Sequence, residues 1–278
     1  MGKKRGFTLI ELLVVIAIIA LLTSILVPVL SSVKRQAMNV ICLSRLKQWG
    51  AIFSMYTSEN DGYFHLRQIG NDFGYQRLWH IIYKPMYQDP RMRFCPTAEN
   101  PNLKTGPFGT WNPAKGSWNP EDYPIPGEGD NQTNYRAPTG SYGMNRYAED
   151  MKGGTYELDP AFWRKVDVKG GSCVPVLLDC QYVYYWANSN SDPPAYNGDY
   201  TTPEMHWIAI DRHFGNVNCT MLDFSARKVG IKELWTLKHN RIYDQCGPWS
   251  ICGFGGDKAA CAAAWDEAAP WMSKMPEY

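Results

Sequence analysis

The longest apolar run of the chain extends from Phe7 to Leu30 and contains a single ionisable side chain, Glu11. As a helix rising 1.5 Å per residue, this run would span about 36 Å, enough to cross a hydrocarbon layer of about 30 Å. The preceding MGKKRG holds three consecutive basic residues, which favour a cytoplasmic N-terminus. The pattern therefore predicts a transmembrane helix over residues 7–30.

Two ordinary explanations of this run fit less well. A secretory signal peptide usually has an apolar core of about 7–15 residues and ends at a small-x-small cleavage site, and neither feature is present here. A simple membrane anchor does not account for Glu11, because a carboxylate in hydrocarbon is costly and usually marks a function or a partner. The carboxylate therefore needs a specific explanation.

Beyond residue 30 the pattern changes to that of an amphipathic helix. Apolar side chains recur at steps of three or four residues, at Val33, Ala37, Val40, Leu43, Leu46, Trp49, Phe53 and Tyr56. Pro28 lies between the two halves and is expected to kink the helix rather than end it. The Asn60-Asp61-Gly62 turn signal closes the element. We expect one helix over residues 7–60, whose second half packs on a globular head over residues 61–278.

The head contains two clear strand patterns. VPVLLDCQYVYYWA, residues 174–187, is rich in β-branched and aromatic residues and predicts a strand. MHWIAIDRHFGNVNCTMLDFSARKV, residues 205–229, predicts a meander of three strands with turns at Gly215-Asn216 and near Ser225. SYGMNRY, residues 141–147, is interpreted as a compact aromatic turn.

The rest of the head is less regular. Residues 64–95 predict a short mixed segment in which helix and strand are hard to separate. Of the 43 residues from 96 to 138, 13 are Pro or Gly, so this stretch is expected to form a loop-rich excursion. The predicted fold class is α+β: a long N-terminal helix on a small antiparallel sheet with long irregular loops.

The N-terminal residues also carry a family resemblance. KKRG followed by FTLIELLVVIAIIALL resembles the class III leader of type IV pilins and type II secretion pseudopilins. The resemblance implies that a prepilin peptidase cuts after Gly6, so that residues 1–6 are a leader, and that Phe7 is then N-methylated. It also implies that Glu11 meets the amino-terminal charge of a neighbouring subunit. A buried carboxylate is tolerable when a cation neutralises it, which agrees with that role.

The head is similar, in patches, to a group of pseudopilin-like proteins. The matching stretches are CLSRLKQWG, RFCP, SYGMN, VLLD and DRHFGNVNCTMLDFSARKV. The group is marked by a histidine followed ten residues later by Asp-Gly-His, and His213 and Asp223 occupy the first two positions. Phe224 and Ser225 replace the glycine and the second histidine. Because Phe tolerates a positive φ poorly, the tight turn after Asp223 is in question.

Charge and motifs exclude several functions. The formal net charge is +1, and loss of three basic residues with the leader would change it to −2, which argues against a nucleic-acid partner. No Gly-x-Ser-x-Gly, HExxH or phosphate-binding glycine loop occurs. An acid–base or metal cluster would need His206, Asp211, His213 and Asp223 to lie together, but alternation along strands would partly split them. We therefore expect a structural protein and no enzyme.

The chain has eight cysteines, and because most of it is expected to lie outside the cytoplasm, disulfides are plausible. A zinc site would be expected to use close ligand pairs such as C-x-x-C, and none occurs. Other members of the resembled group have cysteines in both the C-x-x-x-L and F-C-P motifs, which implies a disulfide between Cys42 and Cys95. Two buried free thiols are the alternative.

Calcium is the one cofactor that the resemblance implies, because major pseudopilins of the resembled family hold it in a C-terminal loop. Asp192, Asn197 and Asp199 in SNSDPPAYNGDY are weak candidate ligands. The alternative is that these residues simply form turns. No other metal or cofactor is expected.

The leading expectation is a structural subunit of a type II secretion pseudopilus or pilus-like filament. Its partners would be other pilin-like subunits, the prepilin peptidase, the membrane and an inner-membrane secretion platform. It would cross the cytoplasmic membrane once, with its head in the periplasm or outside, or reside in an extracellular filament. Two alternatives remain: an adhesive pilin whose head, in a chain with 11 Trp and 17 Tyr, binds glycan, and a tethered hydrolase using His213 and Asp223. The secreted cargo and the choice between major and minor subunit stay open.

Overall fold

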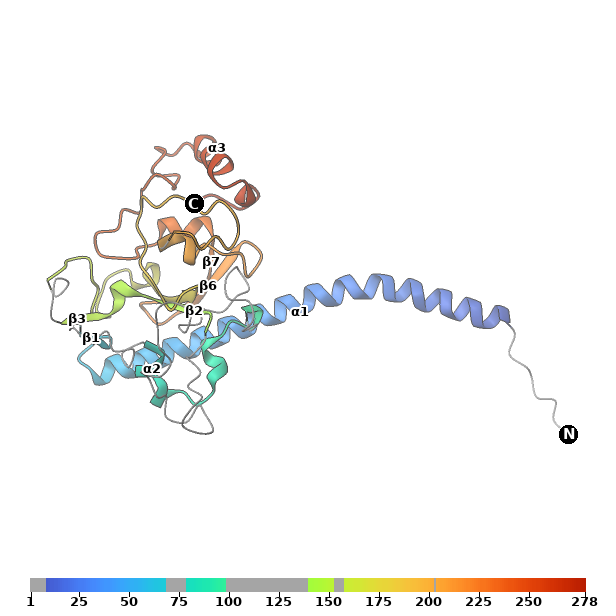
Figure 1. Cartoon of the computed structure of the whole chain (residues 1–278), viewed down its shortest axis with the longest axis horizontal. Coiled ribbons are helices and arrows are strands. Elements are labelled where there is room, and N and C mark those ends of the chain that lie inside the picture. Colours follow the sequence, from blue (N-terminus) through green and yellow to red (C-terminus); the bar gives the residue numbers. More distant parts are fainter. Residues whose placement is uncertain (1–8, 69–78, 99–139, 153–157, 203) are drawn as a thin grey trace.

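The computed structural model describes residues 9–68, 79–98, 140–152, 158–202 and 204–278. Figure 1 shows a long helix, α1 (Leu9–Glu59), whose N-terminal half projects from the head while its C-terminal half runs along it. The three α-helices assigned in this part of the chain are α1, α2 (Trp79–Ile82) and α3 (Lys258–Ala268). The predicted architecture of a long helix on a small head is confirmed.

Helix α1 is continuous over 51 residues and passes through Pro28 without a break. At 1.5 Å per residue it is about 77 Å long. It ends where the sequence predicts, in a turn with Asp61 and Gly62 both at positive φ, 53° and 80°. The expected start at Phe7 lies outside the described residues.

The buried face of α1 differs in part from the predicted stripe. Its buried residues are Asn39, Cys42, Leu46, Trp49, Gly50, Ile52, Phe53 and Thr57. The prediction is correct at Leu46, Trp49 and Phe53, and Tyr56 is partly buried. Val33, Ala37 and Val40 are exposed. The head begins to cover the helix at Asn39, where the Asn218 side-chain amide donates a hydrogen bond of 2.8 Å to Asn39 Oδ1. A polar contact thus occupies the place where apolar packing was expected.

The head contains a five-stranded, mostly antiparallel sheet in the order β5-β2-β4-β6-β7. Only β2 and β5 pair in parallel among these neighbours. A second, two-stranded parallel sheet pairs β1 with β3. The strands are β1 (Leu66–Gln68), β2 (Tyr142–Asn145), β3 (Asp150–Lys152), β4 (Pro175–Asp179), β5 (Tyr184–Tyr185), β6 (Asn216–Met221) and β7 (Ala226–Gly230).

The five-stranded sheet has a core on each face. Strand β6 shows the division, because its side chains alternate as a strand requires. Val217, Cys219 and Met221 enter the core shared with α3, whereas Asn218 and Thr220 bond to α1, Thr220 through the Leu46 carbonyl at 2.7 Å. In Figure 1, α1 and α3 accordingly lie on opposite sides of the strands.

Three segments differ from the predicted secondary structure. Residues 174–187 were expected to form one strand, but they form two, β4 and β5, which lie on either side of β2 in the sheet. Residues 205–213 were expected to form the first strand of a meander, but they form a 3₁₀ turn, Glu204–Trp207, and irregular chain. Their apolar residues are buried in the core shared with α3, but the segment does not pair with a strand. An apolar run alone therefore did not distinguish a strand from a buried irregular segment. SYGMNRY is a strand, β2, followed by a 3₁₀ turn, Arg146–Ala148, rather than a turn alone.

The remaining connections use short 3₁₀ helices. These are η2 (Lys84–Met86), η3 (Pro90–Arg93), η4 (Pro96–Ala98), η8 (Gly171–Cys173), η10 (Lys232–Thr236) and η11 (Pro270–Met272). The predicted loop-rich excursion over residues 96–138 lies outside the described residues except at η4.

The turn between β6 and β7 packs closely on α1. Phe224 occupies the left-handed region at φ 63°, so the turn forms although glycine is absent, closed by a hydrogen bond of 2.8 Å from Met221 N to Ser225 O. A Cβ added at Gly50 would lie 2.5 Å from Phe224 O. Contact at that distance is not possible without a backbone shift, so a glycine is needed here.

We expect Gly50→Ala to lower the free energy of unfolding by about 1–3 kcal/mol, as overpacking does. Helix propensity alone predicts the opposite sign, a gain of about 1 kcal/mol. Denaturant unfolding of the full chain in detergent, followed by tryptophan fluorescence, measures the difference. Ser44→Ala, at an exposed position of the same helix, is the control and should be nearly neutral. A stabilised Gly50→Ala protein would contradict the close contact.

Candidate functional site

The first candidate site is the N-terminal helix. Gly6 and Phe7 lie outside the described residues, and Glu11 lies in the first turn of α1 with its side chain exposed. Within the described chain, α1 is the helix long and apolar enough to cross a membrane, and its apolar window is not buried by the head. An exposed apolar surface of this size needs lipid or neighbouring helices to cover it.

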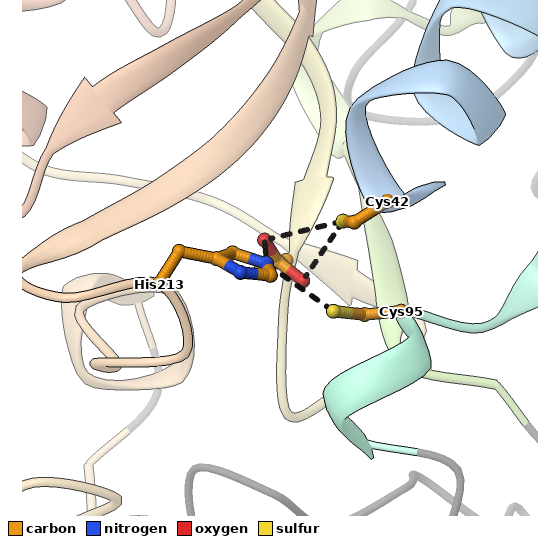
Figure 2. A group of neighbouring side chains, drawn as sticks. Cys42, Cys95 and His213 are labelled. Atoms are coloured by element: carbon orange, nitrogen blue, oxygen red, sulfur yellow. Dashed lines mark hydrogen bonds and ion pairs between the residues drawn. The ribbon is translucent and has the colours of Figure 1, made fainter. Parts of the chain in front are cut away.

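The second candidate site is a buried cluster of Cys42, Cys95, Asp179 and His213. One donor atom from each residue lies within 4.8 Å of the others, and all four residues are buried. Figure 2 shows the side chains of Cys42, Cys95 and His213 pointing toward one another from separate segments. Cys42 comes from α1, Cys95 from the link between η3 and η4, and Asp179 from the end of β4.

Several hydrogen bonds fix the segment that carries Cys95. The Arg45 guanidinium donates to Phe94 O at 2.6 Å, and the Trp49 indole N–H donates to Met92 O at 2.6 Å. Cys95 N donates to Ser141 Oγ at 2.6 Å. These bonds hold the RFCP segment against both α1 and the residue that precedes β2.

A tight turn positions His213. Asp211 Oδ1 accepts a hydrogen bond of 2.7 Å from Gly215 N, while Phe214 and Gly215 adopt positive φ values of 57° and 76°. The turn reverses the chain before β6 and leaves His213 almost completely buried. Its Nε2 faces the cluster, and its Nδ1 has no hydrogen-bond partner among the described residues.

Asp179 is the centre of the polar contacts. Its Oδ1 lies 3.2 Å from Arg212 Nη1, and its Oδ2 lies 3.2 Å from His213 Nε2. Oδ2 also accepts a hydrogen bond of 2.9 Å from Asn218 N. A buried carboxylate requires such compensation, because desolvation of an unpaired charge costs several kcal/mol.

The pKa values reflect this pairing. Burial raises the pKa of the Asp179 carboxyl, but the charge of His213 and its hydrogen bond, together with Arg212, lower it to about 2. Burial lowers the pKa of His213, but the Asp179 carboxylate raises it to about 10. Burial raises the pKa of the Cys95 thiol, yet hydrogen bonds from Cys42 and His213 lower it to about 6. Asp179 is therefore ionised at neutral pH.

Cys42 and Cys95 do not form the disulfide that the resemblance implies. The structure brings Cys42 and Cys95 together, but both are free thiols. Tyr142 OH donates to Cys42 Sγ at 3.2 Å, and Cys95 Sγ lies 3.2 Å from His213 Nε2, so each sulfur has polar partners. The disulfide formed in the described chain is Cys246–Cys252.

His213 and Asp223 do not form a pair. Asp223 is exposed and accepts hydrogen bonds from Ser225 N and Ser225 Oγ, at 3.0 and 2.6 Å, so it shapes the β6–β7 turn, whereas His213 pairs with Asp179. Sequence reasoning missed Asp179. The available signal was an aspartate ending the apolar strand VPVLLD, since a carboxylate at the end of a buried strand needs a partner.

The weak candidate calcium ligands Asn197 and Asp199 make hydrogen bonds and contacts with nearby residues. Asn197 Oδ1 accepts from Asp211 N at 2.9 Å, and Asp199 Oδ1 accepts from Thr201 N at 2.9 Å. Asp199 Oδ2 lies 3.4 Å from His206 Nδ1, and Asp192 is exposed. These contacts support the interpretation that the residues form turns.

Comparison with known proteins identifies the N-terminal segment. Residues 1–27 match the family described as the prokaryotic N-terminal methylation motif. A stretch of 63 residues is 40% identical to the type IV wide pilus major component PilA4 of Thermus thermophilus, covering 23% of this chain and 48% of that protein. The chain thus matches about half the length of this curated relative, and no solved structure matches it. In its methylation motif and in its long helix on a small, mostly antiparallel head, the chain resembles type IV pilins.

Proposed function

We propose that this chain is a structural subunit of a type II secretion pseudopilus, assembled with other pilin-like subunits after prepilin processing. The observation that carries the proposal is the projecting half of α1, which is apolar, exposed, marked by Glu11 and part of the methylation motif. Before assembly this surface lies in the membrane, and in the filament it packs on the same surface of neighbouring subunits. The same helix serves both purposes because both surroundings are apolar.

The structure of the head favours the proposal that subunits assemble through the N-terminal helix alone. Its two buried cores form within one chain, and the C-terminal half of α1 belongs to one of them. The subunit can therefore leave the membrane without unfolding its head. In this proposal the helix crosses the cytoplasmic membrane once, with the head outside the cytoplasm, next to the secretion platform.

The size of the head favours a short secretion filament over a long pilus. The matched 63 residues make up 48% of the PilA4 relative but 23% of this chain, so this chain is about twice as long. This chain is therefore larger than the wide-pilus subunit that it matches, and this difference in size is the basis for preferring a secretion filament. Removing the protein from its cells and measuring secreted proteins and surface pili separately tests this choice: loss of pili with normal secretion would contradict it.

The adhesive alternative gains no support from the described tryptophans, none of which is exposed. Trp49, Trp79, Trp163, Trp235 and Trp265 are all buried, and many make edge contacts within the cores, as Trp49 does with Trp79 and Trp235 with Trp265. Such rings stabilise packing rather than present a glycan surface. Trp111 and Trp118 lie outside the described residues.

Processing gives the most direct test. We expect the mature chain to start at N-methylated Phe7, because KKRG-FTLIE has the form of a prepilin leader. Mass spectrometry of the protein from membranes of cells with an active prepilin peptidase measures this. A Gly6→Leu variant, altered at the expected cleavage position, should keep Met1 or Gly2 as its first residue. Recovery of the unprocessed wild-type chain from the same cells would disprove the prediction.

A further inference from the structure

The buried cluster has the composition of a closed metal site. Its donors are two sulfurs from Cys42 and Cys95, a carboxylate oxygen from Asp179 and the Nε2 of His213. Structural zinc takes four protein ligands in a tetrahedron, from cysteine, histidine and, less often, aspartate. We propose that these four residues form a structural Zn²⁺ site that joins α1 to the sheet of the head.

The spacing of the donor atoms fits a tetrahedral ion. Zinc bonds of 2.0–2.3 Å place neighbouring ligand atoms about 3.3–3.8 Å apart. Cys95 Sγ and His213 Nε2 are 3.2 Å apart, His213 Nε2 and Asp179 Oδ2 are 3.2 Å apart, and Cys42 Sγ and Asp179 Oδ2 are 3.9 Å apart. All the donor atoms lie within 4.8 Å of one another, so movements of up to about 1 Å would bring them to tetrahedral spacing.

Charge balance supports a divalent ion. In the loaded site the ion would displace the protons of both thiols and of His213 Nε2. Two thiolates and the Asp179 carboxylate would then carry three negative charges, and Zn²⁺ with the Arg212 guanidinium three positive charges, with His213 neutral. Arg212 contacts Asp179 through Oδ1 and is buried with it, which leaves Oδ2 to face the other ligands. The loaded site would bury no net charge, so it avoids the cost of an uncompensated ion.

The surrounding groups hold the ligands in place. Tyr142 OH contacts Cys42 Sγ at 3.2 Å, Thr97 Oγ1 lies 2.9 Å from Cys95 Sγ, and Asn218 N donates to Asp179 Oδ2. Metal ligands in proteins are usually oriented by hydrogen bonds of this kind. Thiolate and imidazole ligands in a four-donor site favour zinc over calcium or magnesium, which prefer six or more oxygen ligands.

A disulfide explains the cluster less completely. A bond between Cys42 and Cys95 would satisfy the two sulfurs but would give no reason for His213 Nε2 and Asp179 Oδ2 to face them. Zinc uses all four groups. The ligands come from four segments far apart in the sequence, so the ion would fix α1 to the head close to Asn39, where the helix first becomes buried.

The test is the metal content of the full-length protein purified in detergent without chelator. We expect about one zinc ion per chain by mass spectrometry of the metal, lost in the Cys42→Ser/Cys95→Ser protein. Cys173→Ser, which removes an exposed free thiol, is the matched control and should keep its zinc.

A second measurement does not depend on a variant that folds. Wild-type protein stripped by a chelator under reducing conditions and reloaded with Co²⁺ should show the thiolate-to-cobalt charge-transfer band and the visible absorption of tetrahedral Co²⁺. Denaturation with chelator but without reductant should let both cysteines alkylate. A Cys42–Cys95 cross-linked peptide, or a wild-type protein that holds no zinc and gives no cobalt–thiolate band, would overturn the proposal.

Discussion

A Glu11→Leu protein is expected to insert into the membrane as well as the wild type and yet be absent from filaments. Insertion should not suffer, because leucine is cheaper than a carboxylate in hydrocarbon by about 3 kcal/mol on biological scales. Assembly should fail, because the variant lacks the charge that we expect to neutralise the amino terminus of a neighbouring Phe7. Quantifying the protein in washed membranes and in sheared filaments separates the two steps.

Two further variants sharpen this experiment. Val15→Leu is an apolar change at another exposed position of the same helix, and it should assemble normally. Glu11→Gln keeps the size and hydrogen-bonding ability but removes the charge, so it should fail as Glu11→Leu does if charge is the requirement. Normal incorporation of Glu11→Leu into filaments would refute the role of Glu11 in assembly, whatever its effect on insertion.

Asp179→Asn is expected to lower the free energy of unfolding by about 3–5 kcal/mol, the range for breaking a buried ion pair by removing one partner. The change keeps the side-chain volume but removes the negative charge that faces the fully buried Arg212 guanidinium. His213 loses the same carboxylate. Unfolding in denaturant with excess chelator measures the effect independently of any bound metal.

Asp223→Asn is the matched control for this loss. Asp223 occupies a marked position of the resembled pseudopilin-like group. Its side chain is exposed, and among the described contacts it accepts hydrogen bonds only from Ser225, within a turn. We expect a loss below about 1 kcal/mol, because exposed polar contacts contribute little. Equal losses in the two variants would show that the Asp179 cluster does not stabilise the head as its geometry implies.

The N-terminal helix was predictable because its determinants are local. Length, apolar composition, Glu11 and the basic leader are all read within about 30 consecutive residues, and the Asn60-Asp61-Gly62 turn ends the helix where the sequence places it. The class of the head, α+β with a small antiparallel sheet, also followed from local patterns such as VPVLLD. Hydrophobic periodicity predicts these features because it depends only on residues that are close in the sequence.

The errors in the head arose where tertiary packing outweighed local pattern. The pattern of residues 205–213 predicts a strand, but their apolar side chains fill a core and the segment pairs with no strand. Asn39 is buried in place of Val40, because a hydrogen bond to Asn218 across the helix–sheet contact compensates its polarity. Neither outcome can be read from a window of neighbouring residues.

The buried cluster was decided only by the tertiary structure. The absence of a C-x-x-C pair in the sequence argues against a zinc site. In the structure, however, Cys42 and Cys95, which are 53 positions apart in the sequence, meet beside Asp179 and His213. The sequence alone predicted the long apolar helix, the N-terminal methylation motif and the class of the head, because these depend on contiguous residues. Which side chains converge depends on the order of strands and on turns such as that at Gly215, which set distances between residues far apart in the chain.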